Sequence, residues 1–232
     1  MPEEVPATLL VIGSGAIGME FASFYGDLGT KVTVVELLDR ILPIEDEEIS
    51  RIARKAFEDQ GMTIHTSAKV TNLKREGEGV TSSIQTEDGM QQLAADRAIL
   101  AVGIVGNIED IGIESTAIEV DKSHIVVDKW MQTHEADIYA IGDLVGPPWL
   151  AHKASHEGIV CVESLAGVEG VEPLNRNRIP ACTYSRPQVA SVGLTEQSAK
   201  SAGHRVKTGQ FDLSANCLLY TSPSPRDATL SR

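Results

Sequence analysis

Three glycines near the start of the chain stand at spacings of two and three residues, in Gly13-Ser14-Gly15-Ala16-Ile17-Gly18. The first glycine permits a tight turn, the second removes the side chain where a pyrophosphate must approach the backbone, and the third lets a helix pack against the preceding strand. The free N–H groups and the positive dipole end of that helix then face the phosphates. The pattern predicts a dinucleotide site, and the alternative is that the glycines serve only a tight turn.

A carboxylate follows at Glu36, 18 residues after the third glycine and at the end of an apolar, β-branched run. In this position a carboxylate can accept hydrogen bonds from an adenosine ribose and would repel a 2′-phosphate. The spacing therefore predicts NAD rather than NADP. Arg40 lies close by and weakens the exclusion of NADP, and a solvated surface charge is the alternative role for Glu36.

A second group of polar residues lies in the run that ends at Asp143 and in the following stretch Trp149-Leu-Ala-His152. Asp143 either caps a turn or faces a ligand. The N–H groups that open the next helix could face an anionic or electron-rich ligand. His152 and His156 have the i, i+4 spacing of metal ligands, but no third ligand is evident, so we expect no metal site.

The composition restricts the class of protein. The net charge is −13, from 33 acidic and 20 basic residues, which argues against nucleic acid or an anionic membrane as the main partner. The three cysteines, at 161, 182 and 217, have neither metal-site spacing nor the number of a disulfide framework. No export signal and no apolar run of about 18 residues is found. We therefore expect a soluble, cytoplasmic protein.

These candidate sites need a framework that positions them. The apolar run 7–12, a helix that begins at Ala16 and a strand over 31–36 predict a β-α-β unit, with a second helix over 46–60. Short strands over 62–88 and a strand over 98–102 predict a doubly wound unit with an antiparallel insertion. We expect apolar stripes on the two helices, at Ile17, Phe21 and Phe24 and at Ile49, Ile52, Ala53, Ala56 and Phe57.

The second half of the chain is less regular. We predict an extended crossover over 121–135, a strand over 137–141, a helix over 150–166, a strand-like stretch over 181–194 and a helix over 195–202. Residues 217–232 show neither helical nor strand periodicity, and they contain two Ser-Pro steps. A natural disordered tail is one interpretation. We favour translated adapter or vector sequence and exclude these residues from the fold.

Four motifs, in this order, resemble the dihydrolipoyl dehydrogenases, which belong to the FAD-dependent disulfide reductases. They are Gly-Ser-Gly-Ala-Ile-Gly-Met-Glu at 13–20, Val-Val-Glu36, Ile-Tyr-Ala-Ile-Gly-Asp143, and Leu-Ala-His-Lys-Ala-Ser-His-Glu-Gly at 150–158. Residues 179–193 are similar to the start of that family's dimerisation domain, and the resemblance covers about residues 5 to 216. It implies a Rossmann-like NAD domain at 1–122, the C-terminal part of an FAD domain at 123–175, the start of an α+β dimerisation domain at 176–216 and a non-native tail at 217–232.

The resemblance also implies roles for individual residues. The implied NAD contacts are Gly13, Ser14, Gly15, Ala16, Ile17, Gly18, Met19, Glu20, Glu36, Val70 and Gly103. The implied FAD contacts are Asp143, which would bond the ribityl or phosphate part, and Trp149, Leu150, Ala151 and His152 beside the flavin ring. Glu20 falls where the family pairs a glutamate with a lysine near the flavin, and that lysine would lie upstream of Met1.

The activity implied by the resemblance is the transfer of two electrons from dihydrolipoamide through a cysteine pair to FAD, and then as hydride to NAD. Implied partners are a second subunit in a homodimer and the lipoyl domains of 2-oxo acid dehydrogenase complexes.

This sequence departs from the family pattern in several places. It has no C-x-x-x-x-C pair, no first FAD glycine motif and no C-terminal His and Glu in the family context, and residues 104–107 replace a common Arg-x-Pro-Asn turn. We therefore expect a fragment that is inactive alone and carries none of the catalytic residues. Two alternatives stay open: another disulfide reductase, similar to mercuric or glutathione reductase, or a non-catalytic NAD-binding module.

Overall fold

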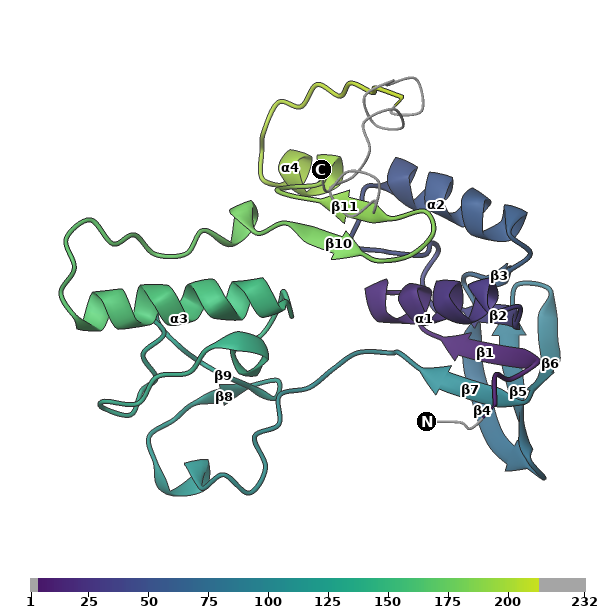
Figure 1. Ribbon diagram of the computed structural model, residues 1–232, viewed down its shortest axis with the longest axis horizontal. Helices are drawn as coiled ribbons and strands as arrows, with labels where there is room; N and C mark the ends of the chain where they lie inside the picture. Colours follow the sequence, from purple (N-terminus) through teal and green to yellow (C-terminus); the bar gives the residue numbers. More distant parts are fainter. Residues whose placement is uncertain (1–3, 213–232) are drawn as a thin grey trace, which may run out of the picture. The chain divides into compact units, whose positions relative to one another are not determined.

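The computed structural model describes residues 4–212, so the prediction of a non-native tail at 217–232 lies outside the described residues. The chain divides into two compact units, with the division between Gly193 and Leu194. Figure 1 shows the elements along the chain. The α/β class is confirmed, because a parallel sheet with its connecting helices is combined with antiparallel sheets. The domain borders at 122/123 and 175/176 stay predictions.

The predicted β-α-β unit is confirmed as part of a four-stranded parallel sheet with the order β3-β2-β1-β7. Its strands are β1 (Thr8–Ile12), β2 (Lys31–Val35), β3 (Thr63–His65) and β7 (Arg97–Leu100). Helix α1 (Ala16–Asp27) connects β1 to β2, and α2 (Glu47–Asp59) connects β2 to β3. Neighbouring parallel strands need a crossover connection of this kind, which the two helices supply.

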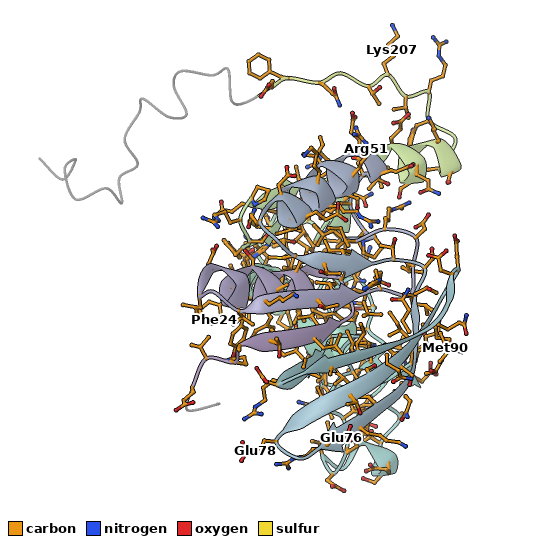
Figure 2. The ribbon with its side chains drawn as sticks, turned by 90° about the vertical axis from the view of Figure 1, so that its right-hand side faces the viewer. Phe24, Arg51, Glu76, Glu78, Met90 and Lys207 are labelled. Atoms are coloured by element: carbon orange, nitrogen blue, oxygen red, sulfur yellow. The ribbon has the colours of Figure 1, made fainter. Side chains whose placement is uncertain are left out.

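The antiparallel insertion is also confirmed. Strands β4 (Lys69–Glu76), β5 (Gly79–Thr86) and β6 (Gly89–Ala95) form a meander in the order β4-β5-β6. Figure 2 labels Glu76 and Glu78 at the turn between β4 and β5. The turns of this sheet fall at 77–78 and 87–88, and Gly79 and Gly89 begin the strands that follow them.

The side chains of β1 alternate between two cores, as the pleat of a strand requires. Leu9 and Val11 belong to the cluster with the helices, whereas Leu10 and Ile12 belong to the cluster with the antiparallel sheet. The first cluster also contains Met19, Ala22, Val32, Val34, Ile41, Leu42, Ala53, Phe57, Met62, Ile64 and Val189. The second also contains Val35, Ala68 and Ile84. The parallel sheet is therefore covered on both faces, which explains its continuous apolar strands.

The predicted apolar stripe of α1 is wrong. Ile17, Phe21 and Phe24 are all exposed, and Figure 2 labels Phe24 on this helix. The buried face of α1 consists instead of Gly18, Met19, Ala22 and Ser23. Three of these four residues are small and the fourth is the flexible Met19, because α1 begins directly after β1 and a Cβ on Gly18 would already lie 2.0 Å from Gly13 O. Aromatic rings do not fit so close an approach.

The predicted face of α2 is only partly correct. Ala53 and Phe57 are buried and Ala56 is half-buried, but Ile49 and Ile52 are exposed. Ser50 takes the buried position, and its hydroxyl donates to the carbonyl oxygens of Ile41 and Leu42. The polar side chain is buried because it satisfies backbone acceptors in the loop before the helix.

The stretch after β7 contains the hairpin β8 (Val120–Asp121) and β9 (His124–Ile125), a 3-10 turn η2 (Gly142–Val145) and helix α3 (Ala151–Leu165). A further short turn, η1, spans Ile113–Ser115. Helix α3 confirms the predicted helix over 150–166. A small core joins Ile125, Ala140 and Val145.

The predicted strand over 137–141 is wrong. This segment makes one isolated bridge, between Gln132 and Tyr139. Its backbone hydrogen bonds are local, from Thr133 N to Ile138 O and from Ala140 N to Met131 O, both at 3.0 Å. An apolar run forms a strand only where another strand offers it a ladder, and among residues 4–212 no such strand lies beside this run.

The remaining elements are short. A turn η3 (Arg176–Arg178) precedes the antiparallel pair β10 (Ala181–Thr183) and β11 (Val189–Ser191), which confirms strand structure within 181–194. In the second unit, α4 (Glu196–Ser201) confirms the predicted helix, and the Thr195 side chain caps it by accepting from Ser198 N. No helix within residues 4–212 has the length and apolar character needed to cross a membrane.

Candidate cofactor-binding site

The candidate dinucleotide residues gather at one edge of the parallel sheet. Strands β1, β2 and β7 run in the same direction and are neighbours, so their carboxyl ends share that edge. Gly13 follows β1, Glu36 follows β2, and the segment to Gly103 follows β7. Ligands of open parallel sheets bind outside the carboxyl ends of the strands.

The three glycines differ in why a side chain is excluded. Gly13 has a φ of +97°, and a Cβ there would lie 2.3 Å from Ala101 O. A Cβ on Gly18 would lie 2.0 Å from Gly13 O, inside the contact of helix and strand. A Cβ on Gly15 would meet nothing within 4 Å. Packing therefore requires glycine at 13 and 18, whereas Gly15 leaves open space of the kind that an approaching phosphate would use.

Helix α1 begins directly after this open space. Gly15 precedes it in an extended conformation, and no side chain caps the helix or places an acidic group in its first turn. A 12-residue helix with an uncapped N-terminus presents orphan N–H donors and a partial positive charge. This end of α1 is therefore suited to an anionic group, and a pyrophosphate fits it.

Glu36 is the acidic group of this edge, and only 8% of its surface is exposed. Its Oε2 accepts from Ser14 N at 2.8 Å and from Ser14 Oγ at 2.7 Å, while Oε1 accepts from Leu38 N at 2.9 Å. The sequence predicts the position of Glu36 but not the two bonds from Ser14, because nothing in the spacing shows which way a side chain turns.

The other predicted NAD residues occupy different surroundings. Val70 lies in β4 and is half-buried against the second core, two residues after Ala68, whose N donates to Glu36 O. Gly103 is exposed, with a φ of +138°. The side chain of Met19 is fully buried in the first core.

Glu20 makes a contact that the sequence does not reveal. Its Oε1 accepts from Tyr184 N at 2.8 Å. One and two turns further along the same helix, Ser23 Oγ accepts from Arg186 N and Asp27 pairs with the Arg186 guanidinium at 2.7 Å. The polar face of α1 thus binds the backbone between β10 and β11.

The second candidate site is built around Asp143, which is exposed on the η2 turn. Gly142 opens this turn with a φ of +78°. The buried Lys153 donates to Gly142 O at 2.9 Å and to Gly146 O at 2.7 Å, and the buried Glu157 accepts from Gly142 N at 2.8 Å. Two side chains of α3 therefore hold both ends of the turn that presents Asp143. Their i, i+4 spacing is visible in the sequence, but their role is not.

Two ring contacts accompany this turn. Trp149, 38% exposed, donates from Nε1 to His124 Nε2 at 3.2 Å, and His124 Nδ1 donates to Lys122 O. His152 donates from Nε2 to Pro180 O at 2.7 Å. His124 was not predicted as a site residue, since it lies 25 positions before its partner. An exposed indole, a carboxylate on a fixed turn and the uncapped start of α3 fit an aromatic, hydroxyl-bearing cofactor such as FAD.

Residues 4–212 bring together no group of three His, Cys, Asp or Glu side chains suited to a metal ion. His152 and His156 therefore lack a third ligand in the described part of the chain. Cys161 and Cys182 are free thiols, and burial together with the nearby Asp128 charge raises the pKa of the Cys161 thiol.

A parallel sheet with a glycine turn and an acidic residue at its carboxyl edge defines an α/β protein of the dinucleotide-binding class. The family model described as "Pyridine nucleotide-disulphide oxidoreductase" matches residues 2–158, and the dimerisation domain of the same family matches residues 179–228. The chain belongs to this family. Membership implies FAD and a pyridine nucleotide as cofactors, and a homodimer as the family's assembly.

The chain is similar to proteins named dihydrolipoyl dehydrogenase. It is 51% identical over 216 residues to the one from Rhizobium etli, covering 93% of this chain and 45% of that protein, and 49% identical to the one from Zymomonas mobilis, covering 93% and 46%. The chain spans about half the length of the curated relatives it matches.

Solved structures agree with the fold. LpdA from Mycobacterium tuberculosis matches with a TM-score of 0.85 at 29% identity, over 95% of this chain and 48% of that one. The HOCl-induced flavoprotein disulfide reductase RclA from Escherichia coli matches with a TM-score of 0.81 at 29% identity, over 92% of this chain and 48% of that one.

Proposed function

We propose that this chain supplies the NAD site and one wall of the FAD site of an enzyme that oxidises dihydrolipoamide to lipoamide and reduces NAD to NADH. The identity of 49–51% to two dihydrolipoyl dehydrogenases supports this activity over the other activities of the family. Its working form is a homodimer, and its partners are the lipoyl domains of 2-oxo acid dehydrogenase complexes. A cytoplasmic location is part of the proposal, because free thiols such as Cys161 and Cys182 persist in a reducing compartment.

On the NAD side, the residues proposed to bind are those from Gly13 to Glu20, with Glu36, Val70 and Gly103. The pyrophosphate lies at the start of α1, over Gly15, where N–H donors point outward. Glu36 accepts hydrogen bonds from the adenosine ribose. The single observation that carries this proposal is the Glu36 carboxylate fixed beside the glycine turn, 2.7 Å from Ser14 Oγ.

On the FAD side, we propose that Asp143 accepts a hydrogen bond from the ribityl chain or orients the phosphate part. Trp149, Leu150, Ala151 and His152 line the flavin ring, with the N-terminus of α3 directed at it. Bound FAD would supply the two-electron chemistry, while these residues orient it and exclude water. Lys153 and Glu157 keep the Asp143 turn in one conformation, so that little order has to be gained on binding.

The sequence holds no two cysteines at C-x-x-x-x-C spacing, so the disulfide step cannot be carried by this chain alone. We expect no lipoamide-dependent NADH oxidation from the purified chain, with or without added FAD. The binding part of the proposal is tested by calorimetric titration of the chain with NAD and NADP. NAD should bind and NADP should bind at least about tenfold more weakly; equal affinities would refute the assigned role of Glu36.

A second candidate is another flavoprotein disulfide reductase. The structural similarity to RclA supports it, although at 29% identity. A non-catalytic NAD-binding module is the third. Sequencing the genomic DNA upstream of Met1 separates these candidates, because an in-frame cysteine pair with a first glycine motif belongs to a reductase and the residues around that pair distinguish the reductase classes.

A further inference from the structure

We propose that Ser14 is a positioning residue for coenzyme selection: it holds the Glu36 carboxylate in the one orientation that accepts a ribose diol and opposes a 2′-phosphate. This inference rests on the proposed NAD site and assigns the choice between NAD and NADP to a pair of residues. Ser14 acts through Glu36, since its own hydroxyl is fully buried.

Ser14 fixes the Glu36 carboxylate through two hydrogen bonds. Ser14 N and Ser14 Oγ both donate to the same oxygen, Glu36 Oε2, at 2.8 and 2.7 Å. The backbone of Ser14 is itself fixed, because Ser14 O accepts from Leu42 N at 2.9 Å. Two donors from one fixed residue define both the position and the rotation of the carboxylate.

The Glu36 carboxylate keeps one acceptor site for a ligand. A carboxylate offers about four lone-pair sites on its two oxygens. Ser14 occupies two sites on Oε2 and Leu38 N occupies one on Oε1. The one lone-pair site that stays free is on Oε1. A ribose hydroxyl can donate to it, and the three existing hydrogen bonds already fix the orientation of the carboxylate.

The charge of Glu36 lies in a buried site. Glu36 is 8% exposed, and charges interact more strongly in such a site than in water. A 2′-phosphate would bring a second negative group next to a carboxylate that cannot swing away, because three hydrogen bonds hold it. A glutamate free to rotate would oppose the phosphate less, and would lose side-chain freedom on binding NAD.

The test is a double-mutant cycle on the whole chain, read by calorimetric titration with NAD and with NADP. The variants are Ser14→Ala, Glu36→Gln and the double variant. Ser82→Ala is the matched control, because Ser82 is also buried but its hydroxyl donates to a backbone carbonyl, that of Asn72 in the antiparallel sheet, and not to Glu36. Thermal unfolding verifies that each variant is folded, and Ser14→Cys, which keeps the volume and weakens the donor, replaces Ser14→Ala if the latter does not fold.

Ser14→Ala should weaken NAD binding by roughly five- to tenfold and reduce the preference for NAD over NADP by a similar factor. This is less than the roughly ten- to hundredfold expected for loss of a direct hydrogen bond to a charged group, because Ser14 N still donates to Glu36. In the Glu36→Gln background the same substitution should change NAD binding by less than about twofold, because its target is altered. Ser82→Ala should leave both affinities unchanged.

Three results would overturn the inference. Tighter NAD binding by Ser14→Ala would mean that Ser14 occupies Glu36 and competes with the ribose. An unchanged preference in Ser14→Ala, or an equal loss in both backgrounds, would mean that Ser14 has no role through Glu36. A wild-type chain that binds neither nucleotide would refute the proposed NAD site itself, which is a different failure from the first two.

Discussion

The ammonium group of Lys153 lies 3.3 Å from the carboxylate of Glu157, and neither side chain has any exposed surface. Both residues belong to α3, yet their hydrogen bonds are directed at the turn that carries Asp143. The two charged groups therefore pair with each other, and both are hydrogen-bonded to the backbone of this turn. The pair therefore ties helix α3 to the Gly142–Val145 turn.

Substitution of Lys153 by Met should be strongly destabilising, because it leaves the buried Glu157 carboxylate without its cation. We expect a loss of about 3–5 kcal/mol in the free energy of unfolding, measured by urea denaturation. Lys55→Met is the control, since Lys55 forms an exposed i, i+4 pair with Asp59. That control should change stability by less than about 1 kcal/mol. Equal effects of the two substitutions would contradict the role of the buried pair.

Alanine substitution should have different effects on stability and on NAD binding at two glycines of this motif, Gly18 and Gly15. Gly18→Ala places a Cβ 2.0 Å from Gly13 O, so the contact of α1 with β1 must open, at a cost of about 1–3 kcal/mol. Gly15→Ala adds a methyl group in open space, so stability should change by less than about 1 kcal/mol. It should nevertheless weaken NAD binding by roughly tenfold or more, because the phosphate approaches there. Denaturation and titration of both variants give the comparison; normal NAD binding by a stable Gly15→Ala variant would exclude this approach.

The exposed Asp96 should make stability depend on pH. Hydrogen bonds from the Thr8 backbone and side chain lower the pKa of Asp96 below its ordinary value of 3.8. A carboxylate with a depressed folded-state pKa stabilises the fold above its unfolded pKa, and this contribution is lost as the pH falls through the folded value. Asp96→Asn should therefore cost stability at pH 6 and progressively less below about pH 4. Urea denaturation at several pH values measures the difference, and a pH-independent cost would contradict it.

Cys161 should be protected from alkylation in the folded chain. It is 6% exposed, and burial followed by the negative charge of Asp128 raises its pKa, so little thiolate forms at neutral pH. Cys182 is half-buried, so a reagent reaches its thiol more easily. With iodoacetamide near pH 7.5, peptide mass spectrometry should find Cys182 modified before Cys161, and both modified in denaturant. Faster modification of Cys161 would be the contrary result.

Much of the fold could be predicted because its signals are local. The apolar run before Gly13, the helical spacing after it and the short strands separated by glycines over 62–88 depend only on neighbouring residues. The family resemblance then named the sites. The faces of α1 and α2 could not be predicted as well, because hydrophobicity does not report how closely a helix approaches its sheet. Phe24 is apolar but too large for the face that Gly18 and Ala22 occupy.

The contacts that organise the candidate sites could not be predicted, because they join residues far apart in the chain. Glu36 receives two of its three donors from Ser14, 22 residues away, and Trp149 donates to His124, 25 residues away. For the segment 137–141 the sequence predicts a strand that the structure does not contain. Its composition is that of a strand, but strand structure depends on a neighbour that the described residues do not provide.

Binding of NAD at the glycine turn beside Glu36 is tested most directly by hydrogen–deuterium exchange. Exchange is measured on the chain with and without saturating NAD. Binding there should slow exchange in peptides that cover residues 13–20 and 36–38 and leave exchange across the hairpin of β5 and β6 unchanged. Protection confined to other segments, or no protection while calorimetry reports binding, would contradict it.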